Sequence, residues 1–181
     1  MTIFISGGAA SGKSDLAQDL AVALAGGGVH YYVATMLPCD EEDYRRIGKH
    51  LASREGMGFE TIECGRDILT CLDQADQSGT FLLDSVTALL MNEMFPDPVG
   101  CEMDLQAPAR CAAALVTFAQ SVGNGIFVSD HIYCDADRYD VITEAYRQGL
   151  AHIDRALAMA CDTVLELTAG NVIIHKGELP I

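Results

Sequence analysis

The stretch that most constrains this chain lies at its start, where an apolar, β-branched run leads into a glycine-rich loop. Residues 2–6 read Thr-Ile-Phe-Ile-Ser, and residues 7–14 read Gly-Gly-Ala-Ala-Ser-Gly-Lys-Ser. The loop matches G-x-x-x-x-G-K-[ST] in full, and apolar residues at helical spacing follow over residues 15–24. An ordinary glycine-rich turn is the alternative, but the Lys-Ser offset between a strand and a helix favours a loop that binds nucleotide phosphates.

Each residue type in this loop has a physical role. Small residues let backbone N–H groups wrap a phosphate, and the N-terminus of the following helix adds positive potential. Lys13 is expected to reach the β- and γ-phosphates, and the Ser14 hydroxyl to bind Mg²⁺. The predicted phosphate-binding residues are Gly7, Gly8, Ala9, Ala10, Ser11, Gly12, Lys13 and Ser14.

Length and charge limit the classes of protein to which the chain belongs. Its 181 residues suit a single nucleotide-binding domain over residues 1–181, and half of them are apolar, which argues against disorder. The formal net charge is −15 and no run of Lys or Arg occurs. This charge excludes nucleic acid and anionic membranes as expected partners. A phosphate ligand must therefore rely on local backbone dipoles, Lys13, a few arginines and Mg²⁺.

The cysteines and apolar runs indicate the compartment. Seven cysteines are scattered without a C-x-x-C pair, which indicates reduced thiols rather than disulfides or a zinc site. These are Cys39, Cys64, Cys71, Cys101, Cys111, Cys134 and Cys161. The first apolar run is too short for a signal peptide, and no stretch approaches the length of a membrane span. We therefore expect a cytoplasmic protein.

Strand and helix patterns alternate along the rest of the chain. The further strands are predicted at residues 29–35, 59–63, 80–85, 125–129, 163–167 and 171–175, and the further helices at 40–55, 66–75, 86–95, 109–122 and 139–160. Residues 96–108 are expected to form a surface loop. The predicted fold is α/β and P-loop NTPase-like: a mostly parallel sheet covered by helices on both faces, with a C-terminal hairpin about Ala169 and Gly170.

Asp84 is the natural second residue for a metal ion. It ends the apolar run of residues 80–83, and ligands in open α/β sheets bind at the carboxyl ends of strands. Mg²⁺ at a phosphate-binding loop commonly uses such a carboxylate. The alternative is an aspartate that caps the next helix, and both roles are compatible if Asp84 binds the ion through water.

A basic helix face is the second distinctive feature. Arg46, His50 and Arg54 are four residues apart and so share one face of a helix, with Lys49 one residue aside. A histidine between two arginines suits phosphate binding or nucleophilic attack on phosphorus. A solvated helix face with a surface histidine is the alternative that this pattern alone leaves open.

Taken together, these motifs resemble the bifunctional adenosylcobinamide kinase/adenosylcobinamide-phosphate guanylyltransferase family of cobalamin biosynthesis, essentially from end to end. Residues 5–14 are close to the family's V-T-G-G-A-R-S-G-K-S, and residues 32–35 match a strand ending in A-T. Residues 46–54 match R-I-x-x-H-x-x-x-R, residues 61–63 match T-x-E, and residues 83–92 match L-D-C-L-T…N. The phosphate loop is common to many families, whereas the other motifs in this order are far more specific.

The resemblance implies two reactions at one nucleotide site. In the kinase step, Lys13, Ser14 and Mg²⁺ would position the γ-phosphate of ATP or GTP for attack by the aminopropanol hydroxyl of adenosylcobinamide, a corrinoid. In the transferase step, His50 would attack the α-phosphate of GTP, and adenosylcobinamide phosphate would then accept GMP, giving adenosylcobinamide-GDP. The resemblance also implies a homo-oligomer, a trimer. The nucleotide contacts outside the loop would come from Arg46, Arg54, Glu63 and Asp84.

The departures from the family pattern are clustered. Residues 129–135 read Ser-Asp-His-Ile-Tyr-Cys-Asp where the family usually reads T/S-N-E-V-G-x-G-I-V-P. Ala10 replaces an arginine, Glu55 a proline and Asp154 an asparagine. These changes leave the predicted catalytic residues intact but bear on substrate identity. His131 is either a new site residue or an incidental loop histidine.

Two further functions stay open on sequence alone. The altered segment at residues 130–137 favours a P-loop kinase of the same lineage that phosphorylates a different small alcohol. A nucleotide-binding protein without catalysis is the other alternative. The retention of Lys13, Ser14, Asp84 and His50 argues against it, because loss of catalysis would place no constraint on all four.

Overall fold

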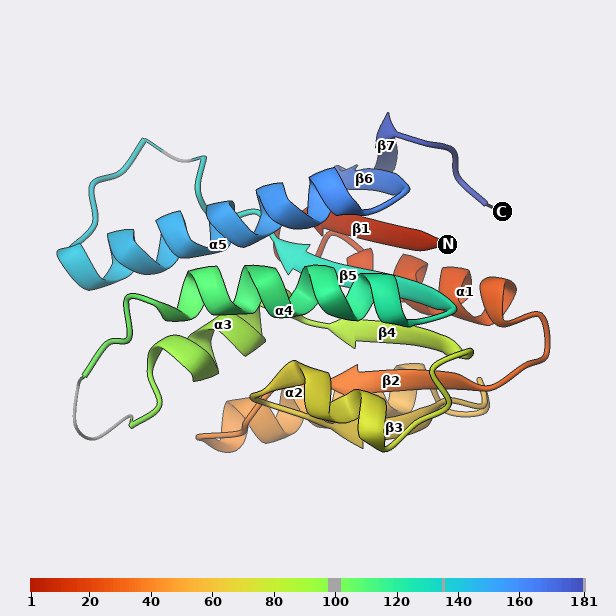
Figure 1. Ribbon diagram of the computed structural model, residues 1–181. Helices are drawn as coiled ribbons and strands as arrows, with labels where there is room; N and C mark the ends of the chain where they lie inside the picture. Colours follow the sequence, from red (N-terminus) through yellow and green to blue (C-terminus); the bar gives the residue numbers. More distant parts are fainter. Residues whose placement is uncertain (98–101, 135, 181) are drawn as a thin grey trace.

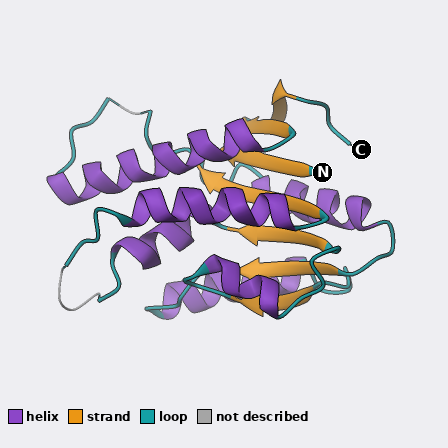
Figure 2. Cartoon of the chain, viewed as in Figure 1, coloured by secondary structure: helices purple, strands orange, loops and turns teal. Residues whose placement is uncertain are grey.

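The computed structural model describes residues 1–97, 102–134 and 136–180, and it shows alternating strands and helices (Figures 1 and 2). Pro98, Cys101 and Asp135 lie outside the described residues. The strands are β1 (Thr2–Gly7), β2 (His30–Ala34), β3 (Glu60–Glu63), β4 (Thr80–Asp84), β5 (Asn124–Asp130), β6 (Thr163–Thr168) and β7 (Asn171–Lys176). The helices are α1 (Lys13–Ala25), α2 (Glu41–Ser53), α3 (Val86–Met94), α4 (Ala107–Ser121), α5 (Val141–Ala160) and a 3-10 helix, η1 (Ile68–Asp73).

The strands form one sheet in the order β3-β2-β4-β5-β1-β6-β7. All neighbouring pairs are parallel except β6 and β7, which form an antiparallel hairpin. Ala169 and Gly170 have φ angles of 49° and 75°, as a two-residue turn between twisted antiparallel strands requires. The predicted parallel sheet with a C-terminal hairpin is therefore confirmed.

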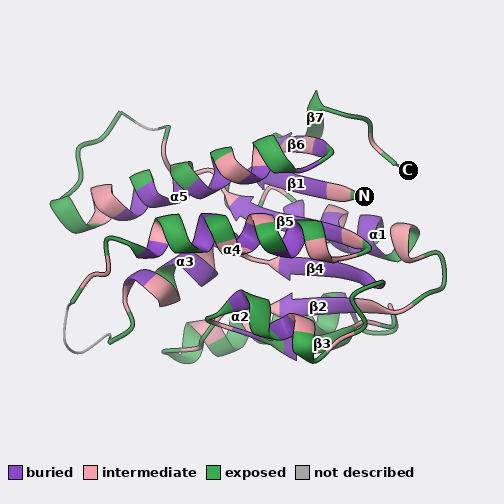
Figure 3. Ribbon diagram, in the orientation of Figure 1, coloured by how far each residue is buried: buried purple, intermediate pink, exposed green. Residues whose placement is uncertain are grey.

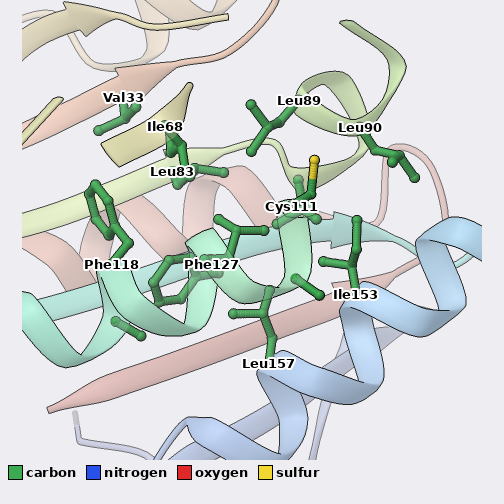
Figure 4. Close-up of a cluster of buried hydrophobic side chains, with 14 of the residues drawn as sticks. Val33, Ile68, Leu83, Leu89, Leu90, Cys111, Phe118, Phe127, Ile153 and Leu157 are labelled. Carbon is green, nitrogen blue, oxygen red and sulfur yellow. The ribbon is translucent and has the colours of Figure 1, made fainter. Parts of the chain in front are cut away.

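Helices cover both faces of the sheet (Figure 1). One core contains α1 residues such as Leu20 packed on Ile3, Ile5 and Leu82. The other packs α3, α4, α5 and η1 against strand residues such as Phe127 (Figure 4). Buried residues line the central strands in Figure 3, which explains their continuous apolar sequences. The six described cysteines are free thiols, and four of them are buried.

Two predicted elements differ from the structure. Residues 66–75 were expected to be a helix, but only Ile68–Asp73 is regular, and it is a 3-10 helix. Its buried residues Ile68 and Cys71 are three apart, which matches the three-residue turn of a 3-10 helix. The predicted loop extended to Pro108, but α4 begins at Ala107, because proline is tolerated in the first turn of a helix.

A buried carboxylate lies where α5 faces the carboxyl ends of the strands. Asp154 is 3% exposed, and its Oδ2 accepts a hydrogen bond from the Tyr133 hydroxyl at 3.0 Å. Burial raises the pKa of Asp154 to about 7, although Ser129 and the hydrogen bond from Tyr133 oppose that effect. The folded chain therefore holds a proton on Asp154 at pH values where the unfolded chain has released it.

We expect Asp154→Asn to remove this pH dependence. Between about pH 4 and pH 7, the wild type should lose on the order of 2–4 kcal/mol of unfolding free energy relative to the variant, because the buried group must ionise. Urea unfolding at pH 4.5 and pH 8 measures the difference, with Asp19→Asn on the exposed side of α1 as the control. A stability difference that is equal at both pH values would contradict the assignment.

Candidate active site

The loop between β1 and α1 is shaped by residues with unusual backbone angles and close contacts. Gly12 caps α1 with φ +92°, and Ala10 has φ +54°. A Cβ atom on Gly7 would lie 2.5 Å from the Leu167 carbonyl oxygen of β6, so only glycine fits there. The loop therefore turns back over the end of the sheet and brings its backbone N–H groups to the N-terminus of α1.

Lys13 is held over this loop by two acceptors. Its side chain is 6% exposed, and Nζ donates a hydrogen bond to the Gly8 carbonyl oxygen at 2.7 Å. Nζ also forms an ion pair with Asp130 Oδ1 at 2.9 Å. An ammonium group buried this far needs such partners, because desolvation without them is costly.

Asp130 is a site residue that the sequence prediction did not include. It is the last residue of β5, which lies between β1 and β4 in the sheet. Asp84 ends β4 in the same way, so two neighbouring strands each end in a carboxylate. The signal that identifies Asp84, an apolar strand ending in aspartate, is also present at Asp130.

Asp84 lies at the centre of a second group of contacts. Its side chain is 9% exposed, and Oδ2 accepts a hydrogen bond from the Tyr32 hydroxyl at 3.0 Å. Burial, together with the charge of Asp84, raises the pKa of Tyr32, so the phenol remains a hydrogen-bond donor. The alternative in which Asp84 caps α3 is wrong, because Ser85 is the cap and accepts from Ala88 N–H.

His50 reaches this group from α2. The His50 Nδ1 atom lies 3.8 Å from Asp84 Oδ2, and the imidazole remains partly exposed. α2 has no buried residue of its own, but Gln18 of α1 donates a hydrogen bond to the Ser53 hydroxyl at 3.3 Å. The end of the helix that carries His50 is thus tied to α1, and His50 lies at the same edge of the sheet as Asp84.

The arginines flanking His50 have different surroundings. Arg54 is buried beneath the end of α2, with its guanidinium 3.9 Å from the centroid of the Tyr32 ring and a hydrogen bond to Thr61. The side chain of Arg46 is 59% exposed and lies 4.0 Å from Glu42. Glu63 is exposed at the end of β3. The structure therefore brings Arg54 and His50 together near Tyr32, whereas nucleotide contacts from Arg46 and Glu63 stay predictions.

Two other residues from the resemblance have structural contacts. The Thr35 hydroxyl accepts from Ser85 N–H and donates to the Ser85 carbonyl oxygen. The Asn92 side-chain amide donates to the carbonyl oxygens of Thr35 and Gly65, both at 2.8 Å. These bonds tie together the chain segments that follow β2, β3 and β4, and so fix the edge on which Asp84 lies.

The donors near the loop fit a magnesium ion. Ser14 offers a hydroxyl at the start of α1 and Asp84 a carboxylate, both hard oxygen donors. Within the described ranges no group of three His, Cys, Asp or Glu residues could hold a metal. Mg²⁺ is typically bound by one or two protein oxygens together with water and phosphate oxygens, so the small donor set matches it.

Solved structures similar to this chain include two ATPases. One solved ATPase domain has a TM-score of 0.56 at 10% identity, over 97% of this chain and 76% of that one. A KaiC-like protein from Pyrococcus horikoshii OT3 has a TM-score of 0.53 at 14% identity, over 98% and 79%. A type III secretion ATPase of pathogenic bacteria has a TM-score of 0.53 at 18% identity, over 93% of this chain and 51% of that one. At these identities the likeness shows the fold alone.

No curated protein sequence matches the chain significantly. No helix among the described residues is long and apolar enough to cross a membrane. One protein family, however, matches residues 3–174, and its description names a cobinamide kinase and a cobinamide phosphate guanyltransferase. The match covers the phosphate loop, His50 and Asp84 together. The chain therefore belongs to the cobinamide kinase/cobinamide phosphate guanyltransferase family.

Proposed function

We propose that the chain, acting as one nucleotide-binding domain, phosphorylates adenosylcobinamide and then transfers GMP from GTP to the product through His50. The observation that carries the proposal is the placement of His50 Nδ1 at 3.8 Å from Asp84, the carboxylate suited to Mg²⁺. Lys13 lies at the same edge of the sheet. A nucleotide bound by the loop would thus have a cation, Lys13, at its terminal phosphates. Its α-phosphate would lie within reach of a nucleophile, His50 of α2.

In the kinase step, the loop amides and Lys13 would bind the terminal phosphates of the nucleotide. The acceptor hydroxyl oxygen attacks the γ-phosphorus, the bond to the bridging oxygen breaks, and the hydroxyl proton is released. Mg²⁺, held by Ser14 and Asp84, would neutralise charge on the phosphate oxygens. Lys13 must exchange Asp130 for a phosphate oxygen, so its ion pair has to open when nucleotide binds.

In the transferase step, Asp84 would orient the imidazole of His50. Nδ1 lies 3.8 Å from the Asp84 carboxylate, and a hydrogen bond formed as the two approach would hold the proton on Nδ1 and leave Nε2 free to attack. Attack on the α-phosphorus of GTP breaks the bond to pyrophosphate and leaves GMP on the histidine. The phosphate of adenosylcobinamide phosphate then displaces the histidine, so one difficult displacement becomes two easier ones.

A kinase of the same lineage with a different alcohol as acceptor is the second candidate. It is favoured by His131 and Cys134, which replace the family's glycine-rich segment after β5. Release of ADP in the presence of a panel of alcohols separates the two. Phosphorylation of another alcohol but not of adenosylcobinamide would favour this candidate.

We expect His50→Asn to abolish covalent labelling by GTP. Wild-type protein incubated with GTP labelled at the α-phosphate should acquire an acid-labile adduct, because a phosphorus–nitrogen bond to imidazole hydrolyses in acid. Labelling is measured after denaturing gel electrophoresis, and melting temperatures check the fold. His152→Asn, an exposed histidine on α5, is the matched control and should label as the wild type does. Label on His50→Asn, or none on a wild type that binds GTP, would contradict the transferase assignment.

We expect Asp130→Asn and Asp84→Asn to change nucleotide binding in opposite directions. Asparagine at position 130 removes a carboxylate that competes with phosphate for Lys13, so the Kd for ATP with Mg²⁺ should fall about three- to tenfold. Asparagine at position 84 removes a metal ligand and should raise that Kd at least about tenfold. Titration calorimetry measures both.

Each variant serves as the control for the other, because both remove one negative charge, from the ends of the adjacent strands β4 and β5. A weaker Kd in both would contradict the role assigned to Asp130 and would indicate that its carboxylate also helps to bind the metal. Repeating the titration without Mg²⁺ separates these cases, since the Asp130 effect through Lys13 does not require the ion.

A further inference from the structure

A row of polar side chains crosses the sheet beside the phosphate loop. Ser6 of β1 is in register with Ser129 of β5 on one side and with Glu166 of β6 on the other. Phe4 and Phe127, two residues earlier in their strands, pack in the core beneath α4 and α5. Because side chains alternate along a strand, the whole row points to the α5 face, opposite α1.

Unpaired polar atoms gather around this row. Among the described residues that are not exposed, five buried side-chain oxygen or nitrogen atoms have no hydrogen-bond partner. They are Ser6 Oγ, Ser11 Oγ, Ser129 Oγ, His131 Nε2 and Asp154 Oδ1. All five belong to the row, to the phosphate loop or to the segments that face the row. Three of these residues have polar neighbours all the same, because Ser129 and Asp154 interact with each other and Ser6 interacts with the Tyr133 hydroxyl. Of the five, His131 lines the cavity described next, so its Nε2 is the atom that a polar ligand there could pair.

A cavity of about 330 Å³ lies at the end of the row. It is lined by Gly8, His131, Ile132, Cys134, Glu166 and Thr168, which we call the acceptor pocket. Gly8 is also the residue whose carbonyl oxygen holds Lys13. The acceptor pocket therefore adjoins the place where Lys13 would meet the terminal phosphate, on the side away from His50 and Asp84.

The charges around the acceptor pocket select the kind of group that can enter it. Glu166 is partly exposed and lies between two histidines, with Oε2 2.7 Å from His175 Nε2 and Oε1 3.8 Å from His131 Nδ1. Asp130 lies next to His131 in the chain. Asp130 is paired with Lys13, whereas the partners of Glu166 are histidines, so the Glu166 carboxylate can accept a hydrogen bond from a hydroxyl or ammonium group that enters the acceptor pocket.

We propose that the acceptor pocket binds the hydroxyl-bearing arm of the molecule that receives the γ-phosphate, with Glu166 accepting a hydrogen bond from that arm. This inference rests on the proposed kinase step. A volume of about 330 Å³ admits an aminopropanol-sized arm, while the bulk of a corrinoid would remain outside.

Alkylation of Cys134 tests the location directly. Cys134 lines the acceptor pocket and Cys39 lies just before α2, and both are exposed, so one iodoacetamide reaction followed by peptide mass spectrometry reads both. Adenosylcobinamide at ten times its Kd should slow alkylation of Cys134 about tenfold. 1-Amino-2-propanol at millimolar concentration should also protect Cys134. Neither compound should change the rate at Cys39.

Glu166→Gln tests the recognition. It should raise the KM for adenosylcobinamide about tenfold, because a charge-assisted hydrogen bond becomes a neutral one, and leave the Kd for nucleotide unchanged. Glu60→Gln, exposed on β3 at the opposite edge of the sheet, is the matched control and should change neither quantity. An equal change in both constants for Glu166→Gln would indicate a structural role and overturn the proposal.

The combined outcomes separate this proposal from the proposed function. If the wild type phosphorylates adenosylcobinamide while Cys134 is unprotected and Glu166→Gln keeps its KM, the pocket assignment is wrong and the kinase stands. If Cys134 is protected but no phosphorylation occurs, the pocket stands and the kinase assignment is wrong. If neither protection nor phosphorylation occurs, both are wrong.

Discussion

The ion pair between Lys13 and Asp130 is the interaction on which the site depends. It forms because β5 lies next to β1, so the last residue of β5 meets the first residue of α1 across the phosphate loop. A lysine this buried requires a counter-charge when phosphate is absent, and Asp130 supplies it. Lys13 also donates to the Gly8 carbonyl oxygen, so its ammonium group joins the phosphate loop to the end of β5.

Anion binding in this chain must be local, because the net charge of −15 repels phosphates at a distance. Lys13 and Arg54 are buried cations at the carboxyl edge, and each contacts a residue of a neighbouring strand: Lys13 contacts Asp130, and Arg54 contacts the ring of Tyr32. Tyr32 in turn donates to Asp84, which faces His50. Two groups of contacts thus lie at this edge, one around Lys13 at the phosphate loop and one that links Tyr32 and Asp84 to α2.

Much of the fold and part of the site could be predicted from the sequence. Continuous apolar runs predict buried parallel strands, and the loop motif identifies Lys13 and Ser14 from eight adjacent residues. The contact between Lys13 and Asp130 joins residues 117 positions apart and depends on strand order, which apolar runs do not encode. Likewise, helical spacing predicts that Arg54 shares a helix face with Arg46. The burial of Arg54 instead results from its packing on the ring of Tyr32, and helical spacing does not encode that contact between the end of α2 and β2.

The central claim is that one nucleotide would meet Lys13 at its terminal phosphate and His50 at its α-phosphate. A crystal structure with Mg²⁺ and a non-hydrolysable GTP analogue measures this most directly. We expect a His50 nitrogen about 3–3.5 Å from the α-phosphorus, with Lys13 Nζ moved from Asp130 to a phosphate oxygen. Phosphates bound in the loop with Lys13 still paired to Asp130, and His50 facing solvent or too distant to attack, would contradict it.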